Sequence, residues 1–137
     1  MIVGPTVVQR VRWADVDKMN VMYYGAYLRH TDAAEAEFFR ALGFTYDTLN
    51  AEYGMWLARV QLDVRYRAPA RLDDDLATRA ELVKVGGSSI HLAFTIDRQA
   101  DGKRLAEVRL VLAVLEAATL TATRVPAPLR SALNASA

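Results

Sequence analysis

The chain has 137 residues, enough for one domain with its own hydrophobic core but few for two, so we expect a single domain over residues 1–137. The net charge of +1 and the scattered basic residues argue against a nucleic-acid-binding surface, and the absence of cysteine excludes disulfides, thiolate metal ligands and a cysteine nucleophile. No secretory signal is visible, and no apolar run reaches the roughly 18 residues that a membrane span needs. We therefore expect a cytoplasmic protein with no membrane span.

The first half of the chain predicts one strand followed by one long helix. Residues 7–14 alternate between apolar and polar side chains, as a half-buried strand does. Over residues 24–42 the apolar spacing changes to the helical period, and Gly43 supplies a C-terminal stop. Because apolar residues also occur away from the main stripe, we expect this helix to be buried nearly all round. A short helical turn is expected over residues 46–52.

The clearest strand pattern covers residues 57–68. Its apolar side chains alternate strictly with polar ones, so we expect one buried face and one exposed face. The side chains predicted to be buried are Val60, Leu62, Val64, Tyr66 and Ala68.

Three further strands are predicted, over residues 76–85, 88–98 and 103–116. The dipeptides Gly86–Gly87 and Asp101–Gly102 favour two-residue hairpins because they tolerate positive φ. The last strand is apolar on both faces and is therefore expected inside the sheet, and residues 126–133 predict a short closing helix. One long apolar helix and a meander of long strands indicate an α+β fold, in which a curved antiparallel sheet wraps around the helix.

Residues 13–40 carry the most informative pattern for function. Asp15 and Asp17 are expected on the same side of a strand-like segment, forming one acidic site where the long helix begins. The helix N-terminus offers free N–H groups and a partial positive charge that can polarise a carbonyl oxygen. This pairing is typical of a hydrolase. Two aspartates could also bind Mg²⁺, but that ion usually needs phosphates or more carboxylates, so no metal site is predicted.

An ordered set of segments resembles the hotdog-fold acyl-CoA thioesterases, in particular the branch of 4-hydroxybenzoyl-CoA thioesterase and the small Tol-Pal-type thioesterases. The match covers nearly the whole chain. It implies the hotdog fold and hydrolysis of an acyl-CoA thioester to free acid and coenzyme A. The matching segments are Asp15-Val16-Asp17, Val21 with Tyr23-Tyr24 and Tyr27, Glu37, Tyr66-Arg67-Ala68-Pro69-Ala70 with Asp73-Asp74, Asp101-Gly102 with Leu105-Ala106-Glu107, and Val125-Pro126 with Leu129.

The resemblance implies that Asp17 is the catalytic carboxylate, acting as nucleophile or as general base on water, and that the N–H of Tyr24 polarises the thioester carbonyl. We interpret Asp15 as a structural residue that holds the loop. Coenzyme A is part of the substrate, so no cofactor is expected. The residues predicted to contact the acyl-CoA are Val21, Met22, Tyr23, Tyr27, Arg59, Arg67, Ser88 and Ser89.

Two positions depart from the family pattern. The loop after Asp17 contains Asn20 where the family usually has Gly or His, and Asn can adopt the left-handed conformation that the turn needs. Glu35 stands where the family usually has Arg, two residues before Glu37, which predicts an altered acyl pocket or subunit contact. Glu35 and Glu37 are also alternative acids, although packing or an ion pair at an interface is the preferred interpretation.

The apolar fraction of 53% predicts that another copy of the chain covers part of the surface, in a homodimer or a homotetramer. Two alternative functions stay open: a non-catalytic acyl-CoA-binding module, and a hotdog dehydratase acting on hydroxyacyl thioesters. A dehydratase needs a histidine near the helix, whereas His30 and His91 are better interpreted as core or interface residues.

Overall fold

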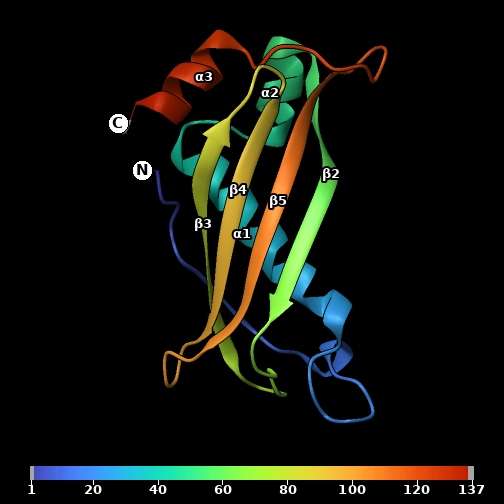
Figure 1. Ribbon diagram of the computed structural model, residues 1–137, viewed down its shortest axis with the longest axis vertical. Helices are drawn as coiled ribbons and strands as arrows, with labels where there is room; N and C mark the ends of the chain where they lie inside the picture. Colours follow the sequence, from blue (N-terminus) through green and yellow to red (C-terminus); the bar gives the residue numbers. More distant parts are fainter. Residues whose placement is uncertain (1, 136–137) are drawn as a thin grey trace.

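A five-stranded antiparallel sheet, in the order β1-β3-β4-β5-β2, is the framework of the structure, a computed structural model that describes residues 2–135 (Figure 1). Long strands joined by short turns pair with their neighbours in antiparallel register. The strands are β1 (Val7–Arg10), β2 (Met55–Tyr66), β3 (Asp75–Val85), β4 (Ser89–Arg98) and β5 (Arg104–Glu116).

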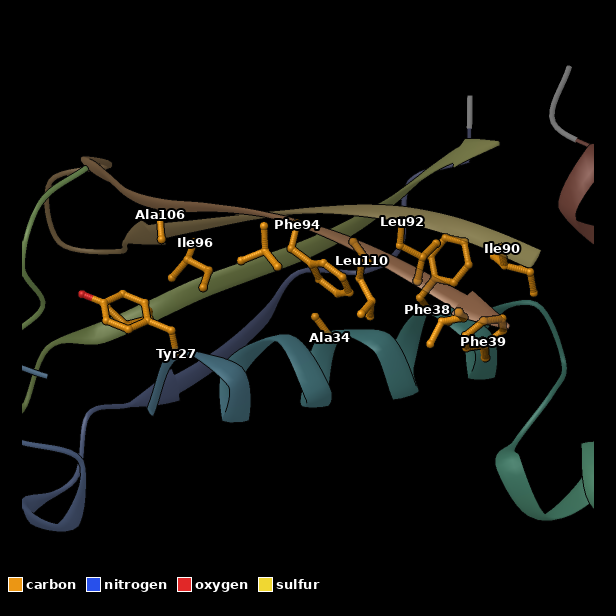
Figure 2. Close-up of a cluster of buried hydrophobic side chains, with 14 of the residues drawn as sticks. Tyr27, Ala34, Phe38, Phe39, Ile90, Leu92, Phe94, Ile96, Ala106 and Leu110 are labelled. Atoms are coloured by element: carbon orange, nitrogen blue, oxygen red, sulfur yellow. The ribbon is translucent and has the colours of Figure 1, made fainter. Parts of the chain in front are cut away.

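Helix α1 (Tyr27–Ala41) runs across one face of this sheet, and the sheet curves over it (Figures 1 and 2). A short 3-10 helix, Tyr24–Ala26, leads directly into it. Helices α2 (Tyr46–Tyr53) and α3 (Ala127–Asn134) are both at the upper end in Figure 1. The expected α+β architecture, a curved antiparallel sheet around one long helix, is confirmed.

The hydrophobic core lies between α1 and the strands above it. Figure 2 shows Tyr27, Ala34 and Phe38 of α1 facing Phe94 and Ile96 of β4. All of these side chains are buried, and Phe38 also packs edge-to-face against Phe39 at 5.3 Å between ring centroids. The helical stripe predicted from the sequence is therefore the face that fills the sheet. In residues 2–135, no helix is long and apolar enough to cross a membrane.

The predicted burial of the strand at residues 57–68 is wrong for three of its five side chains, whereas Val64 and Ala68 pack partly buried against the core. Val60, Leu62 and Tyr66 are 60%, 47% and 48% exposed. The reason is position: β2 is the last strand of the sheet, and β5 is its single partner strand in residues 2–135. Alternation along a strand does not show whether anything covers its apolar face.

A β-bulge also changes the alternation within β2. The register shifts between Arg59 and Gln61, so Val60 is the extra residue. Arg59 consequently pairs with Leu112, and Leu62 with Leu110, so Arg59 and Leu62 share the face on which α1 packs. The sequence pattern placed Arg59 on the opposite, polar face, and the bulge is the physical reason for this error.

Several boundaries differ from expectation. The strand at residues 7–14 ends at Arg10, because residues 13–15 form a 3-10 turn. The hairpin at Gly86–Gly87 forms without positive φ at either glycine, whereas Gly102 has φ 70° in a longer loop than the two residues predicted. Gly43 ends α1 with φ 93°, as expected.

Helix α1 is not buried all round within one chain. Leu28 is 38% exposed and Asp32 is exposed, because the sheet covers one side of the helix and leaves the side next to β2 open. The last predicted strand, β5, lies between β4 and β2 as expected.

Replacement of Phe38 tests the packing between α1 and the sheet. We expect Phe38→Ala to lower the free energy of unfolding by about 3–5 kcal/mol, because it removes a fully buried ring and leaves a cavity. Val83→Ala, at an exposed position of β3, is the control and should cost below about 1 kcal/mol. Urea denaturation of both variants measures the difference, and equal losses would contradict this assignment of the core.

Candidate active site

The loop that carries Asp17 is a small hairpin. Val16 bridges to Met22, the Asp17 N–H donates to the Val21 carbonyl at 3.0 Å, and the Asn20 N–H donates to the Asp17 carbonyl at 2.9 Å. Asn20 has φ 63°, so it adopts the left-handed conformation expected at this turn. The Asp17 side chain is half-buried, and its Oδ1 accepts one hydrogen bond, from the Met19 N–H at 2.8 Å. The hairpin therefore fixes the backbone of Asp17 and leaves the second oxygen of its carboxylate available.

The second arm of this hairpin docks on the segment that follows β2. Val21 bridges to Arg71, and the Met22 N–H donates to the Ala70 carbonyl at 2.8 Å. The Ala70 N–H in turn donates to the Tyr27 hydroxyl at 3.3 Å, which connects the segment to the first turn of α1. Met22 and Tyr27 are buried and support the loop from within the core, whereas Val21 is half-buried.

Asp15 has a different environment from Asp17. It lies in the 3-10 turn rather than on a strand, it is buried, and its Oδ2 accepts hydrogen bonds from the Arg12 N–H at 2.8 Å and from the Arg29 guanidinium. Burial acts to raise the pKa of Asp15, but these hydrogen bonds and the charge of Arg29 outweigh it and hold the pKa below its ordinary value. The expected common strand face for the two aspartates is wrong, and Asp15 holds the loop, as expected.

Arg29 is a residue that the sequence analysis missed. Its guanidinium donates to Gln9 Oε1 and to the Arg10 carbonyl, both at 3.1 Å, and to Asp15. One side chain thus joins β1, the 3-10 turn and α1. The available signal was an arginine near the start of a mostly apolar helix, which does not reveal its partners.

The start of the helix lies beside this loop. The Tyr23 N–H donates to the Asp15 carbonyl at 2.9 Å, and Tyr24 opens the 3-10 helix that continues into α1. Within residues 2–135, the Tyr24 N–H donates to no acceptor, as is usual for the first groups of a helix. The Tyr66 hydroxyl donates to the Tyr24 carbonyl at 2.8 Å, and its ring packs edge-on against Tyr27. Tyr66 is a second residue that sequence reasoning did not assign to the site.

The tyrosine side chains divide into buried and exposed members. Tyr27 is buried, Tyr23 is 43% exposed and Tyr24 is 79% exposed. In a single chain, Tyr23 and Tyr24 therefore present their rings to the surface, while the ring of Tyr27 belongs to the core.

Both arginines predicted to meet the substrate have carboxylate partners. Arg67 donates through Nε and Nη2 to Glu107 Oε1 at 2.8 and 2.7 Å. Arg59 donates to the buried carboxylate of Glu35, and its guanidinium carbon lies 5.8 Å from the centre of the Tyr46 ring. Glu35 therefore forms an ion pair within one chain, whereas the sequence analysis placed such a pair at an interface.

Ser88 and Ser89 lie at the opposite end of the sheet from the Asp17 loop. Ser89 pairs with Ala113 of β5 and its Oγ lies 3.1 Å from His91 Nε2, whereas the segment that holds the Asp17 loop contacts Leu105. The strand between Leu105 and Ala113 is about 26 Å long. Figure 1 shows the loop before α1 at the lower end and the β3–β4 turn at the upper end. One chain therefore does not bring these serines to Asp17.

The remaining candidate acids and histidines do not join the Asp17 site. Glu37 is partly exposed and pairs with Arg40 at 3.4 Å. His30 is 1% exposed in the core, as expected, and its Nδ1 has no hydrogen-bond partner within residues 2–135. Burial, followed by the nearby charge of Arg29, lowers the pKa of His30 to about 4. No group of three or more His, Cys, Asp or Glu side chains suited to a metal ion occurs in the described part of the chain.

Comparison with known proteins gives consistent matches. A family model described as the thioesterase-like superfamily matches residues 11–133. The acyl-CoA thioester hydrolase YbgC of Escherichia coli O6:H1 is 35% identical over 81 residues, which are 59% of this chain and 60% of that protein. The aligned part of this chain thus spans less than two thirds of that relative.

Solved structures show the same fold. A hypothetical protein from Thermus thermophilus superposes with a TM-score of 0.87 at 25% identity, covering 95% of this chain and 97% of that one. A 1,4-dihydroxy-2-naphthoyl-CoA thioesterase from Synechocystis superposes with a TM-score of 0.85 at 17% identity, covering 96% of this chain and 95% of that one. The expected hotdog fold is confirmed.

His30 should make the protein less stable in acid. Because its pKa falls from 6.5 to about 4 on folding, the unfolded chain takes up a proton first as the pH drops through this window. The contribution of His30 is complete above pH 6.5 and is lost toward pH 4, by at most about 3 kcal/mol. Urea titrations at several pH values should show a smaller acid loss in His30→Gln than in the parent. His91→Gln, at a more exposed histidine, is the control. If the free energy of unfolding of His30→Gln fell with pH as steeply as that of the parent, His30 would not be the source of the acid sensitivity.

Proposed function

The chain belongs to the thioesterase-like superfamily, and we propose that it hydrolyses an acyl-CoA thioester to the free acid and coenzyme A. The observation that carries the proposal is that the half-buried Asp17 lies in a loop joined to the helix start by the Tyr23–Asp15 hydrogen bond, next to a Tyr24 N–H that has no acceptor within residues 2–135. The name of the relative YbgC, an acyl-CoA thioester hydrolase, supports the same chemistry.

In this proposal the helix start and the loop have separate roles. The Tyr24 N–H and the positive end of the helix stabilise the negative charge that develops on the thioester oxygen. The Asp17 carboxylate either attacks the carbonyl carbon, releasing the CoA thiolate and leaving a mixed anhydride that water cleaves, or takes a proton from the attacking water. Val21 and Tyr23 line the approach to the thioester carbonyl. Met22 and Tyr27 are buried and support the Asp17 loop from the core.

The alternative dehydratase chemistry finds no support in the position of His30. The His30 ring is buried in the core, and because burial lowers its pKa to about 4 it is neutral at pH 7. It is therefore not placed to exchange a proton with a substrate at the surface.

We propose that a complete site requires a second copy of the chain. Ser88 and Ser89 can assist the same acyl-CoA as Asp17 when they come from a partner, because within one chain the serines lie about 26 Å away along β5. The open side of α1 and the exposed apolar side chains of β2 provide a surface for that partner.

Asp17→Asn tests the catalytic role directly. The substitution keeps size and most hydrogen bonding but removes the charge needed to attack the thioester or to accept a proton. We expect turnover of the best acyl-CoA substrate, followed with a thiol reagent, to fall at least about a hundredfold. The melting temperature and acyl-CoA binding should change little.

Asp15→Asn is the matched comparison. Because Asp15 is buried and bonded to Arg29, this variant should lose more stability and less activity than Asp17→Asn. Near-normal turnover in Asp17→Asn would refute the assignment.

Mixing two inactive variants tests the site between subunits. Asp17→Asn removes the carboxylate, and Ser88→Asp adds a negative charge at a position proposed to contact the anionic coenzyme A. If the two positions serve one site from different chains, random exchange should restore about a quarter of the parent activity in a dimer. Subunit exchange confirmed by native mass spectrometry without any recovery would show that each site is built within one chain.

A further inference from the structure

Arg29 of α1 holds the base of the hairpin that carries Asp17. Its guanidinium donates through Nη2 to the buried carboxylate of Asp15, in the 3-10 turn, and to the Arg10 carbonyl at 3.1 Å. Through Nη1 it donates to Gln9 Oε1, also at 3.1 Å. One side chain of the long helix therefore fixes both β1 and the 3-10 turn from which the hairpin starts.

Asp15 forms the first backbone pair of this hairpin. Its carbonyl accepts a hydrogen bond from the Tyr23 N–H at 2.9 Å. Asp17 follows two residues later on one arm, about 7 Å along the chain, where its N–H donates to the Val21 carbonyl. Tyr24 follows Tyr23 directly on the other arm, where the helix begins. Both groups proposed to act on the thioester therefore extend from the Asp15–Tyr23 pair.

The contact with Arg29 is what joins Asp15 to the helix. The Asp15 carboxylate also accepts from the Arg12 N–H at 2.8 Å, but that bond lies within the same 3-10 turn. Arg12 Nε is 3.8 Å away, and the Arg12 side chain is 61% exposed, compared with 27% for Arg29. Of these contacts, the one with Arg29 connects the turn to another element of the fold.

The shape of the guanidinium matters for this connection. Its Nε is buried without a hydrogen-bond partner within residues 2–135, and the two terminal nitrogens make the contacts. They reach acceptors on β1 and on Asp15 at the same time, whereas lysine has a single nitrogen on a flexible stem. His30 Nε2 lies 3.3 Å from Nη2 and accepts there, because a guanidinium has donors only. Lysine at position 29 would keep the charge and lose part of these contacts.

We propose that Arg29 is a positioning residue for thioester hydrolysis: through the Asp15 carboxylate it fixes the Asp17 carboxylate relative to the Tyr24 N–H. This inference rests on the proposed thioesterase function. Arg29 makes no hydrogen bond to Asp17 within residues 2–135 and acts through the base of the hairpin. Without it the hairpin can tilt about that base, and a shift of about 1 Å in a reacting group can cost about a hundredfold in rate.

Kinetics of Arg29→Ala and Arg29→Lys provide the first test, with octanoyl-CoA and benzoyl-CoA as probes and at a temperature where circular dichroism shows both variants folded. We expect kcat of Arg29→Ala to fall about tenfold to a hundredfold while KM changes less than about threefold, because the lost interaction orients the reacting groups and does not bind substrate. Arg29→Lys should lie between this variant and the parent. Arg40→Ala is the matched control, because it removes an arginine of the same helix that pairs with Glu37.

Rescue by free guanidinium tests the chemistry of the contact. The partly exposed side chain of Arg29 leaves a space that a small cation can enter, next to the Asp15 carboxylate. Millimolar guanidinium chloride should raise kcat of Arg29→Ala at least about threefold and reach a plateau, because the planar cation again bridges the same acceptors. Urea has the same shape without the charge and should not do so. The double variant Arg29→Ala/Asp15→Asn should lose the rescue.

Hydrogen exchange reports on the hairpin independently of activity. In Arg29→Ala, the amides of Asp17 and Tyr23 should exchange at least about tenfold faster than in the parent, because the base of the hairpin opens more often. Amides in the centre of β4 should keep their protection, which separates a local effect from a general loss of stability.

The outcomes separate this inference from the proposed function. Parent-like kcat in folded Arg29→Ala, equal rescue by urea, or rescue that persists in the double variant would overturn the inference while leaving the thioesterase assignment intact. Should Arg29→Ala fail to fold, Arg29→Lys decides, and parent-like kcat in it would overturn the inference. If the parent hydrolyses neither probe, the result counts against the proposed function, and hydrogen exchange in the hairpin still decides whether Arg29 anchors the loop.

Discussion

The packing of α1 against the curved sheet is the constraint on which the rest of the structure depends. Ala34, at the centre of the buried stripe, is small enough to let the helix approach the strands closely, and Phe38 fills the space one turn later. The N-terminal segment uses the same packing, because a side chain at Gly4 would approach Phe38 to 3.1 Å. The helix can therefore shift little without opening the core, and its first residues are held in a fixed place at the sheet end.

This rigidity is passed to the loop that carries Asp17 through polar contacts. Arg29, one turn into α1, binds β1 and Asp15, and the backbone of Asp15 binds Tyr23 just before the helix. The loop is thus attached to the helix from both sides, while Asp17 keeps a carboxylate oxygen free of protein donors within the described residues. Asp15 is buried and secures the loop, whereas Asp17 stays half-buried, as its proposed catalytic role requires.

Sequence reasoning succeeded where a feature depends on local chemistry. The left-handed conformations of Asn20 and Gly43 follow from what those residues tolerate, and the helical stripe follows from its period. It failed where the outcome depends on distant parts of the chain. The bulge at Val60 and the pairing of Arg59 with Glu35 both require knowing which strands are neighbours and in which register. Arg29 was missed for the same reason, since its partners are far away in sequence.

The open side of the molecule is the surface on which the proposed second copy of the chain would pack. β2 is a long edge strand, and such an edge usually pairs with another strand or is covered, because its free backbone groups otherwise promote aggregation. Leu28 and Leu62 are both partly exposed at this side, and both line a cavity between α1 and β2. A partner that covers β2 would therefore also close this cavity from solvent and lower the dielectric around the ion pair of Arg59 with the buried Glu35. The proposed assembly thus acts on the side chains that join α1 to the edge of the sheet.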